Sequence, residues 1–76
     1  MKTIDLTQPF PYSTLIPAMK AIYETQSGEQ LELIFQVHDM DCFKDLKEFL
    51  SQHNVGFREI YNEDTLILQF YKNELS

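Results

Sequence analysis

The stretch from Gln30 to His38, QLELIFQVH, decides the fold. Apolar and polar residues alternate along it, and this period of two is typical of a β-strand that buries one face. The other side is polar apart from Ile34. The pattern predicts one strand over the whole stretch, with a buried face formed by Leu31, Leu33, Phe35 and Val37 and an outer face that carries Glu32, Gln36 and His38.

A helix is predicted before this strand. Ser13 or Thr14 can cap its start, and we expect it to run to about Gln26. Pro17 fits because it lies in the first turn, where its missing N–H would have no partner. Gly28 is expected to end the helix as a left-handed C-cap. Apolar residues at helical spacing predict one inward stripe, formed by Leu15, Ala18, Met19 and Ile22.

A second helix is predicted after the strand. Asp39 or Asp41 can cap it, and a carboxylate there favours the positive end of the helix dipole. Asn54 and Gly56 mark its end. Its inward stripe is expected to consist of Phe43, Leu46, Phe49 and Leu50.

Three further strands are predicted. The first is Thr3–Leu6, near the start of the chain. The other two are Val55–Tyr61 and Thr65–Tyr71, and the short turn at residues 62–64 makes them an antiparallel hairpin. The order of elements is therefore βαβαββ.

This order predicts a single domain over residues 1–76 of the α+β class, a two-layer α/β sandwich. Right-handed crossovers place both helices on the same face of a mixed four-stranded sheet. The other face is expected to be partly wet, with polar alternates at Glu32, Gln36, Arg58 and Gln69.

The charge of the chain limits its partners. Six basic and twelve acidic residues among 76 give a net charge of −6. Nucleic acids and anionic membranes attract basic patches, so we expect neither a nucleic-acid partner nor membrane insertion. Acids such as Glu63, Asp64 and Glu74 are usually a solvated surface, or they steer a domain toward a basic protein partner. With a single cysteine and no apolar leader, we expect a cytoplasmic protein.

Short motifs along the chain resemble the TusA/SirA family of small sulfur carriers, from Ile4 to about Lys72. Asp5-Leu6 matches the end of that family's first strand, and Gly28-Glu29 matches the Gly-Glu before its second strand. Lys44-Asp45-Leu46, followed by Phe49, resembles its Arg-Asp-Ile and Phe at the second helix. The resemblance implies the same βαβαββ fold and a role in sulfur or redox metabolism.

The family's Cys-Pro-x-Pro motif is where the chain departs from it. Counted from Asp5-Leu6 and from Gly28, the motif falls on Pro11, Tyr12, Ser13 and Thr14, so Pro11 stands where the family has its persulfide cysteine. A register shifted by three places it on Gln8-Pro9-Phe10-Pro11 but breaks the spacing on both sides. The thiol is missing in either register. We therefore expect a degenerate member without catalytic residues, which binds a protein partner and needs no cofactor.

Cys42 is the only thiol in the chain. The simplest interpretation is a half-buried, unreactive side chain on the edge of the inward stripe. The alternatives are a relocated persulfide acceptor, which would make the protein a sulfurtransferase, and a redox-sensing or adventitious thiol. The helix start would lower the pKa of the thiol, whereas the like charge of Asp39, Asp41 and Asp45 opposes its ionisation.

The remaining candidates carry weaker signals. Ser13 with His38 or His53 lacks a third group and an oxyanion loop, so we interpret Ser13 as a helix cap. His38 with Asp39 and Asp41 is too weak a pattern to predict a metal site. Phe10 and Tyr12 lie on a proline-rich loop, where exposed aromatic rings would anchor a partner. Alternatively, one of the two rings closes the end of the core.

Overall fold

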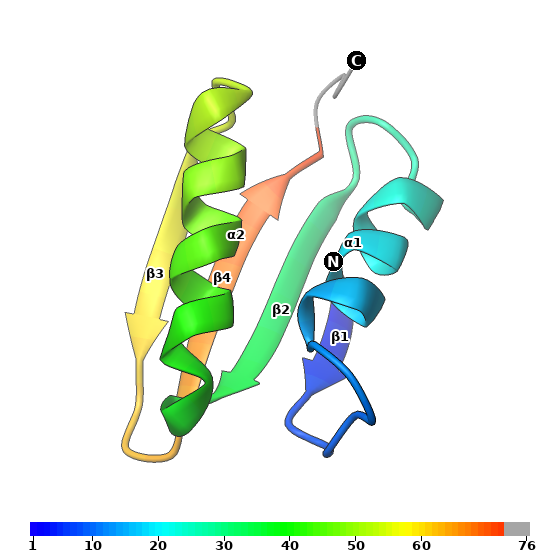
Figure 1. The fold of residues 1–76 in the computed structure, drawn as a ribbon. Helices are drawn as coiled ribbons and strands as arrows, with labels where there is room; N and C mark the ends of the chain where they lie inside the picture. The colour runs from blue at the N-terminus through cyan, green and yellow to red at the C-terminus, as the bar shows by residue number, and fades with distance from the viewer. Residues whose placement is uncertain (73–76) are drawn as a thin grey trace.

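The structure is a computed structural model and describes residues 1–72, so Glu74 lies outside the described residues. Its elements follow the predicted order (Figure 1). They are β1 (Lys2–Leu6), α1 (Leu15–Glu24), β2 (Gln30–Gln36), a 3-10 turn (Val37–Asp39), α2 (Met40–Gln52), β3 (Phe57–Tyr61) and β4 (Thr65–Tyr71).

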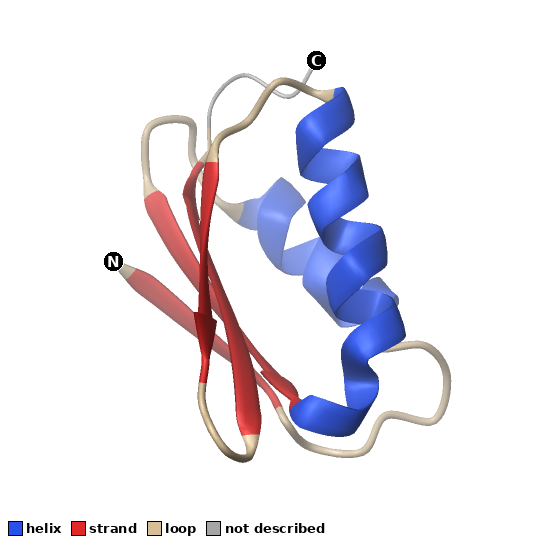
Figure 2. Ribbon diagram, turned by 90° about the vertical axis from the view of Figure 1, so that its left-hand side faces the viewer, coloured by secondary structure: helices blue, strands red, loops and turns tan. Residues whose placement is uncertain are grey.

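The strands form one sheet in the order β1-β2-β4-β3. β1 runs parallel to β2, whereas β4 pairs antiparallel with both β2 and β3. Both helices cover the same face of the sheet, and none of residues 1–72 forms a helix on the other face (Figure 2). The predicted two-layer α+β sandwich is therefore confirmed. None of the helices in residues 1–72 is long and apolar enough to span a membrane.

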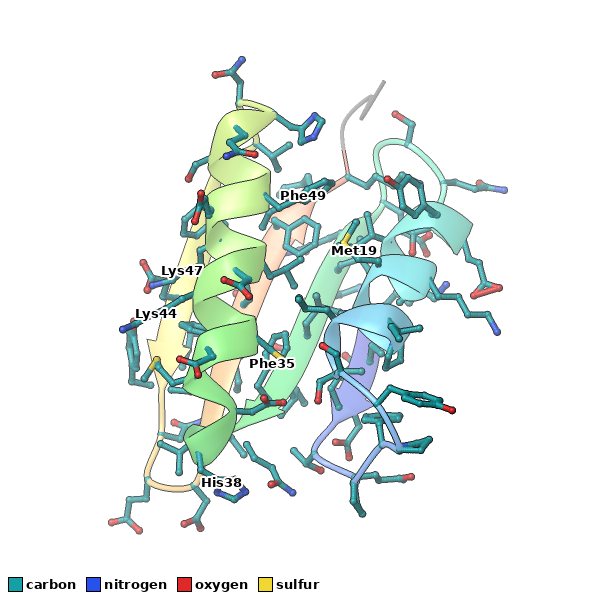
Figure 3. All side chains as sticks on the ribbon, in the orientation of Figure 1. Met19, Phe35, His38, Lys44, Lys47 and Phe49 are labelled. Carbon is teal, nitrogen blue, oxygen red and sulfur yellow. The ribbon has the colours of Figure 1, made fainter. Side chains whose placement is uncertain are left out.

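The core lies between the helices and the covered face of the sheet. Phe35 and Phe43 are fully buried there, and their rings meet edge to face with centroids 5.8 Å apart. Met19 from α1 and Phe49 from α2 are partly buried and pack against this core (Figure 3). The buried part consists of Leu6, Ala18, Ile22, Leu31, Leu33, Phe35, Phe43, Leu46, Leu50, Val55, Leu66, Leu68 and Phe70.

The central strand is shorter than its sequence pattern predicts. β2 ends at Gln36, and residues 37–39 form the 3-10 turn instead. The Val37 N–H still donates to the Asp64 carbonyl at 3.0 Å, the next position of the β2–β4 register, before the chain turns. Val37 is 40% exposed, so the prediction that it lies on the buried face was wrong. The prediction that His38 belongs to the strand was also wrong, because His38 lies in the 3-10 turn.

The predicted end of the first helix was also wrong. α1 ends at Glu24, and its C-cap Thr25 is extended rather than left-handed. Thr25 is buried, and its hydroxyl donates to the Ala21 carbonyl at 2.7 Å. Gly28 does adopt the left-handed region, with φ of 90°, but it does so in the turn before β2. Its N–H there donates to the Lys72 carbonyl.

The end of α2 follows the prediction more closely. Asn54 has φ of 58°, and the Val55 N–H donates back to the Leu50 carbonyl at 2.9 Å. This is a Schellman-type cap, in which Leu50 and Val55 also close the end of the core. Val55 therefore belongs to the cap, and β3 begins at Phe57. Asp39 is the N-cap residue of α2, but its side chain makes no capping hydrogen bond.

The two glycines offer a matched test of backbone strain. A Cβ added at Gly28 or at Gly56 would meet no atom within 4 Å, but only Gly28 has a positive φ. Gly28→Ala should lower the free energy of unfolding by about 1 kcal/mol, because the left-handed conformation costs a residue with a Cβ about 1–2 kcal/mol. Gly56→Ala should be neutral or slightly stabilising. Urea unfolding measures both, and equal effects would contradict this assignment.

Candidate functional site

The loop between β1 and α1 carries the residues aligned with the family motif. Tyr12 is 82% exposed, and Pro11 and Ser13 are exposed beside it. Phe10 is instead partly buried and packs against the core. The Phe10 ring therefore closes the end of the core, whereas the Tyr12 ring is exposed to solvent. Between them lies an apolar pocket of about 150 Å³, lined by Phe10, Pro11, Tyr12, Ser13, Ile16 and Pro17.

The base of this loop is held by side chains of the sheet. The Asp5 carboxylate accepts hydrogen bonds from the Thr7 hydroxyl and, at 2.9 Å, from the Thr7 N–H. These two bonds hold the pKa of Asp5 below its usual value, so the carboxylate stays charged. The side-chain amide of Gln36, the last residue of β2, donates a hydrogen bond to the Thr7 carbonyl. The loop is thus fixed where it leaves the sheet.

Ser13 forms the start of α1. Its hydroxyl accepts a hydrogen bond from the Leu15 N–H at 3.1 Å, and its carbonyl accepts one from the Ile16 N–H at 3.1 Å. Thr14 already has helical angles and makes no side-chain capping bond. Of the two predicted caps, Ser13 is therefore the one that satisfies a free N–H of the first turn.

Cys42 lies against this same helix start. Its Sγ is 3.8 Å from the Ser13 Oγ, although the two residues are 29 positions apart. Cys42 belongs to the first turn of α2 and is partly buried. The fold thus brings the chain's thiol beside the positions aligned with the family's cysteine motif. Sequence reasoning missed this proximity, because no local pattern specifies how two helix ends meet.

The surroundings of Cys42 disfavour the thiolate. Burial raises the pKa of the thiol, and the Asp39 carboxylate raises it further by accepting a hydrogen bond from the thiol and by its charge. The Ser13 hydroxyl and the Leu15 N–H act in the opposite direction but do not prevail. Since the thiolate is the nucleophile, Cys42 is a weak one at neutral pH.

The reactivity of Cys42 can be tested through Asp39. We expect Asp39→Asn to increase the rate of alkylation at pH 8 severalfold, because it removes a negative charge and the acceptor that favour the neutral thiol. Asp41→Asn is the matched control, since Asp41 contributes nothing to the shift. Rates measured against pH should show the Asp39→Asn profile displaced to lower pH. Identical profiles for both variants would contradict the role of Asp39.

The same shift has a consequence for stability. The pKa of Cys42 is raised in the folded protein above its ordinary value of 9.0. The stabilising contribution of the neutral thiol is therefore complete below pH 9.0 and is lost as the pH rises through the folded-state pKa.

The structure does not bring the two histidines to this site. His38 lies in the 3-10 turn, and His53 caps the far end of α2, where its ring packs against Phe49 at a tilt of 51° with centroids 4.5 Å apart. Within residues 1–72, neither histidine forms a hydrogen bond with Ser13. Residues 1–72 hold no group of three His, Cys, Asp or Glu side chains placed to bind a metal ion.

The face of the sheet away from the helices carries a row of isoleucines. Ile34 pairs with Ile67, and Ile67 pairs with Ile60, so three adjacent strands present one isoleucine each. All three are partly buried. We call these residues the isoleucine row. The sequence marks Ile34 as an exception but does not show that two more isoleucines align with it.

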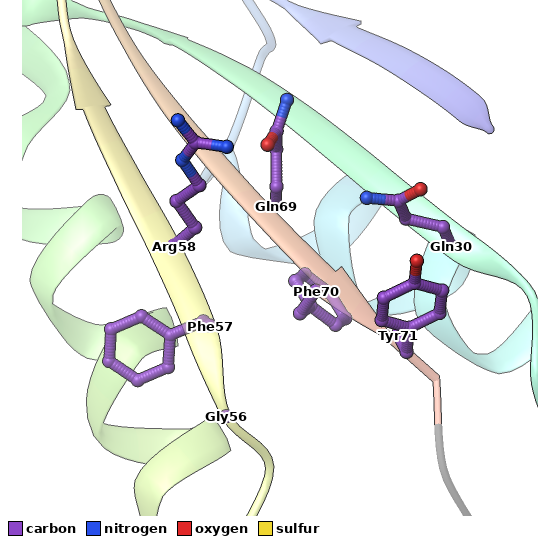
Figure 4. A pocket seen from close by; sticks show the side chains of 7 residues that line it. All are labelled: Gln30, Gly56, Phe57, Arg58, Gln69, Phe70 and Tyr71. Carbon is purple, nitrogen blue, oxygen red and sulfur yellow. The ribbon is translucent and has the colours of Figure 1, made fainter.

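The expected polar residues surround the isoleucine row. Arg58, Gln69 and Glu32 form the next row across β3, β4 and β2. Gln69 donates to Glu32 at 2.7 Å, and Thr3 of β1 donates to the same carboxylate at 3.3 Å. A shallow depression of about 390 Å³ lies at one end of this face (Figure 4), lined by Gln30, Gly56, Phe57, Arg58, Gln69, Phe70 and Tyr71.

Comparison with models of protein families, with curated proteins and with solved structures finds no match for this chain.

Proposed function

We propose that this protein is a non-catalytic interaction or regulatory module of the TusA/SirA type, which binds a protein partner in sulfur or redox metabolism and does not carry sulfur itself. The observation that carries the proposal is the loop before α1. It presents Tyr12, 82% exposed, beside an apolar pocket, and Pro11 stands where the resemblance places the sulfur-carrying cysteine.

The loop has the properties of a preorganised anchor. Its base is held by Asp5 and Gln36, and Pro9 and Pro11 restrict the backbone between that base and Tyr12. Little conformational entropy is then lost when a partner covers the exposed ring, and tyrosine is among the residues that contribute most to binding. The pocket of about 150 Å³ matches one apolar side chain of the partner. The net charge of −6 favours a partner with a basic surface.

Site-specific photo-cross-linking tests this proposal. A photoreactive phenylalanine analogue at Tyr12 should trap a defined protein partner in cells. The same analogue at Tyr23, which is 63% exposed on α1, is the control for a surface aromatic away from the loop. Tyr12→Ser should then weaken binding of the purified partner about tenfold or more. Failure to cross-link at Tyr12, or identical adducts from both positions, would contradict the proposal.

The second candidate is a sulfur carrier that uses Cys42, and one observation favours it. The Cys42 Sγ lies 3.8 Å from Ser13, within the region aligned with the family motif. In this reaction the Cys42 thiolate attacks the outer sulfur of a donor persulfide. The new S–S bond forms on Cys42, and the donor leaves as a thiolate. The raised pKa of Cys42 opposes this step.

Intact-mass measurement separates the two candidates. After incubation with a persulfide donor and removal of the donor, the proposed non-carrier keeps its original mass. A gain of one sulfur atom that Cys42→Ser abolishes would establish the carrier and exclude the first candidate.

A further inference from the structure

The uncovered face of the sheet has an apolar centre. Ile34 and Ile67 lie on the two central strands, β2 and β4, and Ile60 continues the isoleucine row onto β3. A sheet face that meets only water usually carries polar residues at such positions. Three aligned isoleucines on this face therefore require an explanation that the proposed partner loop does not supply.

The charges on this face are separated by sign. Arg58 lies on β3, at one edge of the sheet. The carboxylates of Asp5 and Glu32 lie on the opposite side, on β1 and β2. The registers place these residues on the same face, because Glu32 pairs with Gln69 and Gln69 with Arg58, while Asp5 pairs with Ile34. Gln69 lies between Arg58 and Glu32 in their row, and the isoleucine row is the next row across the sheet, in line with Asp5.

We propose that the uncovered face binds a second copy of this chain, through a two-fold axis that runs parallel to the strands between β2 and β4. Rotation about this axis reverses the strand order of the second copy relative to the first. β2 of one copy therefore faces β4 of the other, and β1 faces β3. Ile34 of one copy then packs on Ile67 of the other, twice. Arg58 of each copy then lies over the β1–β2 side of the other, opposite Thr3 and next to Glu32.

The geometry of packed sheets allows these contacts. Sheets that pack face to face lie about 10 Å apart with their strands within about 30° of each other. An arginine side chain spans most of that separation and suits carboxylate partners. The face is thus complementary to itself at Ile34 and Ile67 and between Arg58 and the acidic side, whereas Ile60 lies opposite Asp5. The self-complementary central pair and charges favour a second copy over an unrelated partner.

The size of the face predicts a weak dimer. Strands of seven residues and a width of four strands give roughly 23 by 19 Å, or a flat footprint of about 440 Å² per copy. A typical stable interface buries about 800 Å² per partner. The net charge of −6 on each copy adds repulsion. We therefore expect dimers in the micromolar range or weaker rather than an obligate assembly.

Sedimentation equilibrium of the full chain tests for the dimer. At physiological salt, the wild-type protein should pass from monomer to dimer between roughly 10 μM and 1 mM, the range of a small interface. Ile67→Lys should keep it monomeric throughout, because it places two cations at the centre of the interface. Circular dichroism should show the same fold. Wild-type protein that remains a monomer at every concentration would overturn the proposal.

A charge exchange tests the arrangement of the two copies. Arg58→Glu places two acids opposite each other at both ends of the interface, and Glu32→Arg places two cations there. Each variant alone should dimerise about tenfold more weakly or worse. In the mixed dimer, the new acid faces the new base at one end of the interface and the unchanged Arg58 faces the unchanged Glu32 at the other, so the mixture should dimerise again.

The controls are charge changes on the exposed surface of the helices. Lys20→Glu and Asp45→Arg change the net charge by the same amounts but lie on α1 and α2. They should leave the association unchanged, alone and mixed. Weaker association of each interface variant alone and its recovery in their mixture, with no change for the control variants, supports the proposed pairing. A dimer that Arg58→Glu does not weaken, or a mixture that fails to restore it, would overturn the proposal.

Discussion

Replacing Phe43 with alanine is expected to remove about 3–5 kcal/mol from the free energy of unfolding. The side chain is fully buried, and its ring makes edge-to-face contacts with Phe35 and Tyr61, both at 5.8 Å. The Lys47 ammonium lies over the ring, 4.9 Å from its centroid. A domain of this size has about 4–11 kcal/mol of stability, so the melting temperature should fall by about 15 °C or more.

Phe49→Ala is the matched control for this loss. Phe49 lies on the same helix but is only partly buried. Its replacement therefore removes less buried apolar surface and leaves a smaller cavity. We expect a cost of about 1–2 kcal/mol. Phe43→Leu keeps most of the volume and should cost about 1.5 kcal/mol or less. Thermal and urea unfolding measure all three, and equal losses at Phe43 and Phe49 would contradict the proposed core.

A cysteine at position 11 should recover the reactivity that the resemblance associates with it. In the Cys42→Ser background, Pro11→Cys places a thiol in the loop four residues before the start of α1. The positive end of a helix lowers the pKa of a nearby thiol, and each unit of lowering gives about tenfold more thiolate at neutral pH. We expect alkylation at pH 7 at least about tenfold faster than at a control thiol, and uptake of one sulfur atom from a persulfide donor.

The control thiol is Ser27→Cys in the same background. Ser27 is exposed beyond the carboxyl end of α1, where the helix dipole disfavours a thiolate. Both variants should unfold at similar temperatures, so that the comparison reports reactivity and not local unfolding. Equal alkylation rates at positions 11 and 27 would mean that position 11 has no special activation, and the proposed relation to the sulfur carriers would lose its chemical basis.

The element order of this fold can be predicted from the sequence because each element has a strong local pattern. The alternation of apolar and polar residues identifies the two central strands. It predicts the first residue of β2 and both ends of β4 correctly. The errors occur at the ends of elements, where the chain turns although the alternation continues. Val37 continues the alternation and its N–H still donates to the Asp64 carbonyl, but residues 37–39 form the 3-10 turn.

The candidate sites depend on contacts that the sequence does not contain. Tyr12 could be singled out, but only the packing of Phe10 against the core decides which of the two rings is exposed. The approach of Cys42 to Ser13 requires the crossing of two helices. The isoleucine row requires the strand register, because Ile34 and Ile60 become neighbours of Ile67 only when β4 lies between β2 and β3.

The position of β4 also determines when the chain can fold. β4 is the last strand along the chain, yet it lies inside the sheet, between β2 and β3. During synthesis, β1 and β2 with α1 can associate early, but β3 has no neighbour to pair with until Tyr71 has left the ribosome. The pairing of Gln30 with Tyr71 also closes a long loop, which slows folding. We therefore expect the sheet to be completed only after translation has passed its final strand.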